Sequence, residues 1–418
     1  MNEEWVRTFK EAVNARLDPT QSTSDEELME LIEEVVLRET GDGRLTAGEK
    51  WEMVQRIFHS YRGLDILQPL IDDASVTEIM INSHRDIFIE RDGRVSRNEA
   101  RFESREKLED IIQAIVAKVN RTVNEMSPIV DARLQDGSRV NVVLPPVALQ
   151  GPTMTIRKFP AQPLTMSDLI AVGALTQEAA ELLGVFVKAK YNIFIGGGTG
   201  SGKTTFLNAL SQGIPADERI ITIEDSAELQ IRTVPNLVSL ETRNANTEGK
   251  GGIGIRDLIR SSLRMRPNRI IVGEVRGAEA LDMLAAMNTG HDGSFSTGHS
   301  NSTADMLSRL EMMVLSAADL PVEVVRKQIS SAIDLMVHLS RMRDGSRKVV
   351  EISELAGLTN GEILLNPLFR FEDQGEDENG RVKGKLIYTG NPLVHGWKSQ
   401  MAGVELPDWI AREKEAAS

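Results

Sequence analysis

The stretch Gly197-Gly198-Thr199-Gly200-Ser201-Gly202-Lys203-Thr204 matches the phosphate-binding P-loop pattern G-x-x-x-x-G-K-[S/T] in full. In this pattern the glycines let the backbone curl until its N–H groups point inward at phosphate oxygens. The lysine adds a positive charge for the β- and γ-phosphates, and the hydroxyl of the last residue ligates Mg²⁺. The sequence therefore predicts that residues from Gly197 to Thr205 bind a nucleotide. Lys203 is also a catalytic candidate, and Thr204 is a metal ligand.

The residues on either side of this loop suit a strand and a helix. Residues 191–195 form a short apolar run typical of a buried strand, and residues 205–210 suit a helix whose N-terminus faces the anion. Over residues 169–340 helical patterns alternate with short apolar runs, which indicates an α/β fold with a parallel sheet covered on both faces. The predicted strands are residues 191–195, 219–223, 270–274 and about 334–339.

The composition limits the class of protein. The chain has 418 residues, 41% hydrophobic and 26% charged, which is globular and long enough for two or three domains. It has no cysteine, so disulfides and thiolate metal sites are excluded. A net charge of −14 argues against general nucleic-acid binding. The sequence shows neither a signal peptide nor a run near the roughly 20 apolar residues of a membrane span. We therefore expect a cytoplasmic protein that makes any membrane contact through a partner or a surface.

The pattern of the chain changes twice before the P-loop. Residues 1–62 are acidic and helical, and Ser24 with Glu27 makes a capping box ahead of apolar residues at helical spacing. Residues 63–158 alternate like strands around one helical segment, which indicates a smaller α+β domain.

Three further segments complete the predicted organisation. A Pro-containing linker at residues 159–168 leads to the nucleotide-binding domain at 169–340. A C-terminal extension follows at residues 341–418. Its acidic run, residues 372–378, is expected to be a solvated loop.

Two predicted strands end in acidic residues. The first ends in Glu224-Asp225, and carboxylates at the end of a strand beside a P-loop hold Mg²⁺, directly or through water, or polarise a nucleophilic water. The second ends in Gly273-Glu274, where an Asp-Glu pair is usual. The Mg²⁺ shell is then expected to rely on Thr204, phosphates, waters and Glu224, which is also a catalytic candidate. Glu274 is the predicted base that orients the attacking water. Taken alone, each segment also fits an ordinary acidic loop or strand end.

Two other groups of polar residues are open to several interpretations. Arg256, Arg260 and Arg264 share one face of a helix, and they fit a solvated stripe, a nucleic-acid track or a subunit interface. We favour the interface over the nucleic-acid track because the chain is acidic. His291 and His299 lie in a stretch rich in glycine and hydroxyls, with spacing that is poor for zinc. The stretch better suits sensing of the γ-phosphate, and a structural role is the alternative for each histidine.

Four segments in order carry a resemblance to a known family. They are the P-loop, residues 223–228, residues 273–277 and residues 297–299. This series resembles the type II/type IV secretion-system ATPases, whose Walker A, Asp, atypical Walker B and His boxes occur in this order and share the Gly-Glu pair. Residues 76–82, 131–141, 263–267 and 341–347 resemble the CpaF-type branch, the tight-adherence (Tad/Flp) pilus ATPases.

The resemblance implies a RecA-like ATPase domain that follows a PAS-like N-terminal domain, in a homohexamer that uses ATP and Mg²⁺. In the family, nucleotide sits between these domains and arginines of the N-terminal domain reach its phosphates. The matching candidates here are Arg133, Arg139 and Arg157, with surface charge as the alternative, and His299 is implied as a further nucleotide contact.

The resemblance also implies a motor function. ATP hydrolysis would drive inner-membrane platform proteins in pilus assembly or secretion, with retraction left open. Two alternatives stay open: a P-loop translocase acting on nucleic acid, and a ring-forming scaffold that binds nucleotide for structure only.

Overall fold

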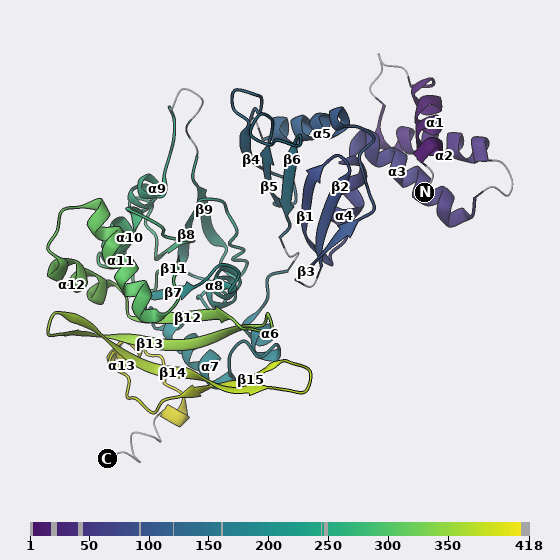
Figure 1. Ribbon diagram of the computed structural model, residues 1–418. Coiled ribbons are helices and arrows are strands. Elements are labelled where there is room, and N and C mark those ends of the chain that lie inside the picture. Colours follow the sequence, from purple (N-terminus) through teal and green to yellow (C-terminus); the bar gives the residue numbers. More distant parts are fainter. Residues whose placement is uncertain are drawn as a thin grey trace. The chain divides into compact units, whose positions relative to one another are not determined.

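The computed structural model describes residues 3–17, 23–40, 45–91, 93–119, 121–159, 162–243, 245 and 250–410. The chain divides into two compact units, residues 1–161 and 162–418 (Figure 1). Residues 160 and 161 of the predicted linker lie outside the described residues, and its last residues begin helix α6 (Met166–Ala171). Among the described residues, we find no helix that is both long and apolar enough to span a membrane.

The first unit begins with three helices. They are α1 (Glu3–Asn14), α2 (Asp25–Thr40) and α3 (Ala47–Arg62). Their apolar faces share a small core that includes Val13, Ile32 and Ile57. The predicted capping box before α2 is confirmed, because Glu27 N donates to Ser24 Oγ at 3.2 Å and Ser24 N donates to Glu27 Oε2 at 2.8 Å.

A six-stranded antiparallel sheet forms the rest of this unit, in the order β3-β2-β1-β6-β5-β4. Helix α5 (Arg105–Lys118) contributes Leu108, Ile112 and Val116 to the core that the sheet residues Ile79 and Ile156 share. β3 and the short helices were not predicted. The elements are η1 (Asp65–Leu67), α4 (Gln68–Asp72), β1 (Val76–Ser83), β2 (Asp86–Arg91), β3 (Arg94–Asn98), β4 (Ile129–Arg133), β5 (Arg139–Val143) and β6 (Thr153–Arg157).

The second unit is built on a nine-stranded sheet in the order β15-β14-β13-β12-β7-β11-β10-β8-β9. The six strands from β12 to β9 run parallel, as predicted, and all four predicted strands are present. They are β7 (Ile193–Gly197), β8 (Arg219–Glu224), β9 (Asn236–Glu241), β10 (Arg269–Val272), β11 (Phe295–His299) and β12 (Leu335–Arg341). β9 and β11 were not among the predicted strands.

Helices cover both faces of the parallel strands. Ile193 and Ile195 of β7 belong to a core on one face with α7 (Gln177–Lys188) and α8 (Lys203–Ser211). Phe194 belongs to the core on the other face with α10 (Glu279–Met287), α11 (Thr303–Ala317) and α12 (Val322–Ala332), and α9 (Ile255–Ser262) adds Ile259 to it. β7, the strand that precedes the P-loop, is therefore buried on both faces. This burial fixes the position of the first residue of the loop.

The C-terminal residues extend the same sheet. β13 (Arg347–Thr359), β14 (Glu362–Glu376) and β15 (Val382–Tyr388) add to β12 as antiparallel strands, and α13 (Gly396–Met401) follows. The prediction of a solvated loop over residues 372–378 was wrong for residues 372–376, which end β14. These residues are exposed but paired, because β15 and an arginine of the preceding hairpin supply partners for an acidic strand.

Candidate nucleotide site

The P-loop joins the end of β7 to the start of α8, and its glycines hold conformations that other residues rarely adopt. Gly200 has φ of +70° and Gly202, which caps α8, has φ of +92°. A Cβ on Gly197 would lie 2.6 Å from the carbonyl oxygen of Leu339 on the neighbouring strand β12. The loop thus requires glycine both for its turns and for its close approach to the sheet.

Lys203 stands at the centre of the polar contacts in this site. Its Nζ donates to the carbonyl oxygens of Gly197 and Gly198 at 3.0 Å each, and it lies 3.4 Å from His299 Nδ1. The opposite ring nitrogen, Nε2 of His299, lies 2.7 Å from Glu274 Oε1. Arg276 Nη2 donates to the other Glu274 oxygen at 2.7 Å. Three predicted site residues from the P-loop, β11 and the end of β10 therefore meet in one row.

Burial and neighbouring charges set the protonation of this row. Burial lowers the pKa of Lys203, which Glu274 partly opposes. Burial also lowers the pKa of His299 below its ordinary value of 6.5, and the positive charge of Lys203 lowers it further. His299 is thus neutral at pH 7. An ammonium at Nδ1 and a carboxylate at Nε2 favour the tautomer with its hydrogen on Nε2.

Glu224 is buried at the end of β8 with 4% of its surface exposed. Its Oε1 accepts hydrogen bonds from the backbone N–H groups of Glu228 at 2.8 Å and Leu229 at 3.1 Å. Gly273 lies against it, because a Cβ there would come within 2.7 Å of Glu224 Cγ. The side chain of Glu224 therefore occupies space that an aspartate at position 273 would need.

The donor set suits a nucleotide with its cation. Backbone N–H groups at a helix N-terminus and the Lys203 ammonium attract phosphates, and the half-exposed Thr204 hydroxyl at the first turn of α8 is a hard oxygen ligand of the kind Mg²⁺ takes. Within the described ranges, three or more His, Cys, Asp or Glu side chains do not gather as a metal-binding group. A cation here would therefore rest largely on phosphate oxygens, water and Thr204.

The three arginines predicted for the N-terminal domain form one row across its sheet. In register, Arg133 of β4 is opposite Arg139 of β5, and Arg139 is opposite Arg157 of β6. Residues directly opposite in an antiparallel sheet place their side chains on the same face. Glu78 of β1 is the next member of the row, opposite Arg157. The family resemblance implied these arginines as one set of candidates, and the strand register places them side by side.

The predicted arginine stripe and His291 are largely engaged in contacts within the chain. Arg256 and Arg260 of α9 donate to the two carboxylate oxygens of Asp282 at 2.6 and 3.0 Å, whereas Arg264 lies beyond the end of the helix. His291 Nδ1 lies 3.3 Å from the carbonyl oxygen of Ala286, a local contact near the end of α10. These contacts engage Arg256, Arg260 and His291 within the chain, away from the row of Lys203, His299 and Glu274.

Two arginines near the site were not predicted. Arg276, within the Gly-Glu-Val-Arg-Gly segment, holds Glu274, and Arg347 at the start of β13 donates from Nε to the carbonyl oxygen of Gly200 at 3.0 Å. The sequence carried a signal for Arg276, which lies two positions after the predicted base. Arg347 follows the P-loop by about 150 residues, and only the pairing of β12 with β7 brings it there.

Comparison with known proteins agrees with this geometry. The chain is 36% identical over 299 residues to the putative conjugal transfer protein Rv3659c of Mycobacterium tuberculosis, covering 70% of this chain and 84% of the relative. It is 32% identical over 320 residues to the type IV secretion system protein VirB11 of Brucella suis, covering 70% and 88%.

Among solved structures, the pilus retraction motor PilT with bound ADP has a TM-score of 0.52 at 20% identity, covering 72% of this chain and 82% of that one, which supports the RecA-like fold. The family described as type II/IV secretion system protein matches residues 61–370. The chain, with its P-loop, Glu274 and His299 gathered at one end of the parallel strands, is a member of the type II/IV secretion system protein family.

Proposed function

We propose that this chain is an ATPase that uses Mg²⁺ and converts hydrolysis into mechanical work. The row from Lys203 through His299 to Glu274 carries the proposal, because it places a phosphate-binding ammonium and a carboxylate on two sides of one neutral imidazole. Lys203 would exchange its carbonyl partners for phosphate oxygens. Glu274 would orient the attacking water and take up its proton, while His299 would report whether the γ-phosphate is present.

The coupled process we propose is assembly of a tight-adherence (Tad/Flp) pilus, or a related secretion step. Homohexamers of the chain would act in the cytoplasm on platform proteins of the inner membrane. The resemblance of residues 341–347 and 263–267 to the pilus branch supports this choice. The row of Arg133, Arg139 and Arg157 supports nucleotide contact by the first unit, since it places three positive side chains on one face of a sheet, and phosphates attract such charges.

Counting surface filaments by electron microscopy tests the proposal in host cells that carry Glu274→Gln in place of the wild-type chain. Loss of filaments at normal protein level is the expected result. Normal filament numbers with the variant would contradict a pilus-assembly motor. As a test of the translocase alternative, we expect single-stranded DNA to leave the ATPase rate unchanged, because the net charge is −14 and two of the three stripe arginines neutralise Asp282.

A further inference from the structure

Arg347 lies against the outer side of the P-loop. Its Nε donates to the carbonyl oxygen of Gly200 at 3.0 Å. Its aliphatic stem runs past Gly202, where a Cβ would come within 3.5 Å of Arg347 Cδ. Arg347 thus contacts two of the loop's glycines from a strand outside the parallel part of the sheet.

The hydrogen bond to Gly200 fixes the direction of a peptide group inside the loop. In a planar trans peptide the C=O and the following N–H point in opposite directions. When the Gly200 oxygen faces Arg347, the N–H of Ser201 therefore faces the interior of the loop, where it donates to the carbonyl oxygen of Gly198 at 3.3 Å. That carbonyl also accepts from Lys203 Nζ at 3.0 Å, so the Ser201 N–H and Lys203 converge on one oxygen.

Gly200 itself does not select this orientation. Its φ of +70° lies in a region that glycine enters as readily as the negative one, so the isolated peptide has little preference. The hydrogen bond from the Ser201 N–H to the Gly198 carbonyl restrains one side of this peptide, and the Arg347 donor restrains the other side.

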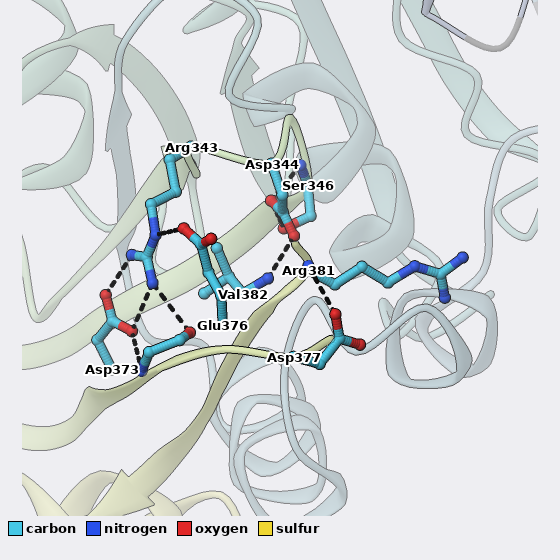
Figure 2. Close-up of polar contacts among 9 residues, drawn as sticks. Arg343, Asp344, Ser346, Asp373, Glu376, Asp377, Arg381 and Val382 are labelled. Atoms are coloured by element: carbon cyan, nitrogen blue, oxygen red, sulfur yellow. Dashed lines mark hydrogen bonds and ion pairs between the residues drawn. The ribbon is translucent and has the colours of Figure 1, made fainter. Parts of the chain in front are cut away.

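The hairpin that carries Arg347 is anchored at its tip by acidic residues of β14. Figure 2 shows Arg343 paired with both Asp373 and Glu376. Arg343 also donates to the carbonyl oxygen of Gly375 at 2.9 Å. These hydrogen bonds, first to Asp373 and then to Glu376, raise the pKa of Arg343. The acidic run therefore secures the β12–β13 hairpin.

A second anchor lies on the same hairpin. Asp344 accepts from the backbone N–H of Val382 on β15 at 2.8 Å and from the Ser346 hydroxyl at 2.6 Å. The Ser346 and Val382 hydrogen bonds lower the pKa of Asp344 to about 2, so the carboxylate stays charged at physiological pH. Arg341 is opposite Arg347 in the last strand pair before the hairpin turn, which sets the point from which Arg347 reaches the P-loop.

We propose that Arg347 is a positioning residue for the P-loop, which acts by holding the Gly200 peptide so that the Ser201 N–H faces the phosphates. The inference rests on the proposed function, since it concerns nucleotide binding at the same loop. It assigns the effect to the Nε–H donor rather than to the positive charge. It also assigns the acidic end of β14 a role in keeping that donor in place.

Three variants of Arg347 separate the donor from the charge. Glutamine places an amide nitrogen where Nε stands and removes the charge, methionine keeps the stem without a donor, and lysine keeps the charge but has a methylene at that position. We expect Arg347→Met and Arg347→Lys to weaken binding of a fluorescent ADP analogue about 10-fold. Arg347→Gln should stay within about threefold of wild type.

The steady-state kinetics add a readout that a general loss of structure would not give. An orientation needed equally in ground and transition states raises KM and leaves kcat within about twofold. The thermal midpoint of the nucleotide-free variants should equal that of wild type, since Arg347 is exposed. Arg343→Met, which releases the hairpin tip, should weaken binding in the same direction by a smaller factor.

Two results would overturn the inference while leaving the proposed function intact. In the first, the wild-type chain binds the ADP analogue and Arg347→Met binds it as tightly. The other is Arg347→Lys that binds as wild type while Arg347→Gln is as weak as methionine, because the charge would then be what acts. A wild-type chain that fails to bind the analogue would instead overturn the proposed function, and this inference with it.

Discussion

Gly273 and Glu224 are sterically matched across neighbouring strands: a Cβ on Gly273 would lie 2.7 Å from Glu224 Cγ and 3.3 Å from Glu224 Oε1. Glu224 has little freedom to withdraw, because backbone N–H groups of Glu228 and Leu229 hold its carboxylate. An aspartate is usual at position 273, before Glu274. Glycine is needed there because any larger side chain would occupy the space that Glu224 takes at the end of β8.

The first prediction is that Gly273→Ala displaces Glu224 and destabilises the second unit. Overpacking of this kind costs about 1–3 kcal/mol in the free energy of unfolding. Urea denaturation of Gly273→Ala, Glu224→Ala and the double variant measures the coupling between the two positions. We expect the alanine at 273 to cost less when Glu224 is already shortened. Additive effects of the two substitutions would show that the positions are not matched.

Glu274 and Lys203 should have separable roles in the catalytic cycle. Glu274→Gln keeps the shape of the row but removes the base, so we expect nucleotide affinity near wild type and a kcat that falls about 10²–10⁴-fold. Lys203→Ala removes the phosphate-facing ammonium, and we expect nucleotide affinity itself to be lost. Equilibrium binding and ATP turnover measured on both variants check this. Normal turnover by Glu274→Gln would remove Glu274 from the role of base.

The local parts of this site were predictable, and the long-range parts were not. The P-loop and its flanking strand and helix follow from about 20 adjacent residues, in which glycine spacing and apolar runs report local structure. β14 was missed because its charged end lacks alternation, and only Arg343 and β15 make an acidic strand favourable there. β9 was missed because its residues are exposed or half-buried at the sheet edge. The contact of Arg347 with Gly200 depends on strand order, which a single sequence does not state.

Removing one partner of a buried ion pair should destabilise the second unit. Arg269 is fully buried at the start of β10, and its Nε and Nη2 donate to the two carboxylate oxygens of Glu218 at 2.7 Å each. Its Nη1 donates to the carbonyl oxygen of Val187 at 2.8 Å. Arg269→Met removes both guanidinium hydrogen bonds from the buried Glu218 carboxylate and leaves it the Lys190 ammonium at 4.0 Å. We expect a loss of about 3–5 kcal/mol in the free energy of unfolding.

Chemical denaturation of Arg269→Met checks the size of this loss. The matched control is the double variant Arg269→Met/Glu218→Gln, in which the stranded charge is also removed. We expect the double variant to recover part of the stability. A double variant that is less stable than the single one would contradict the account, because the penalty would then come from lost packing rather than an unpaired carboxylate.

His338 should make stability depend on pH. It lies on β12 opposite Gly196 of β7 and is 6% exposed. Burial lowers its pKa below the ordinary 6.5, an effect that Lys203 adds to and that Glu351 and Asp305 oppose. The unfolded chain therefore binds a proton at this position more readily than the folded chain. The stability that neutral His338 contributes is complete above pH 6.5 and is lost as the pH falls from 6.5 toward the lower pKa of the folded state.

Thermal unfolding at pH 7.5 and pH 5.5 tests this sign with wild type and His338→Gln. One additional proton bound on unfolding changes the free energy by at most about 1.4 kcal/mol per pH unit. We expect the midpoint of wild type to fall more between the two pH values than that of His338→Gln, each compared with its own value at pH 7.5. Comparing the change in thermal midpoint with pH removes the constant loss of stability that comes from replacing the buried imidazole ring of His338. Equal slopes for the two proteins would show that His338 titrates alike in the folded and unfolded chains, and the acid sensitivity of the unit would then belong to other groups.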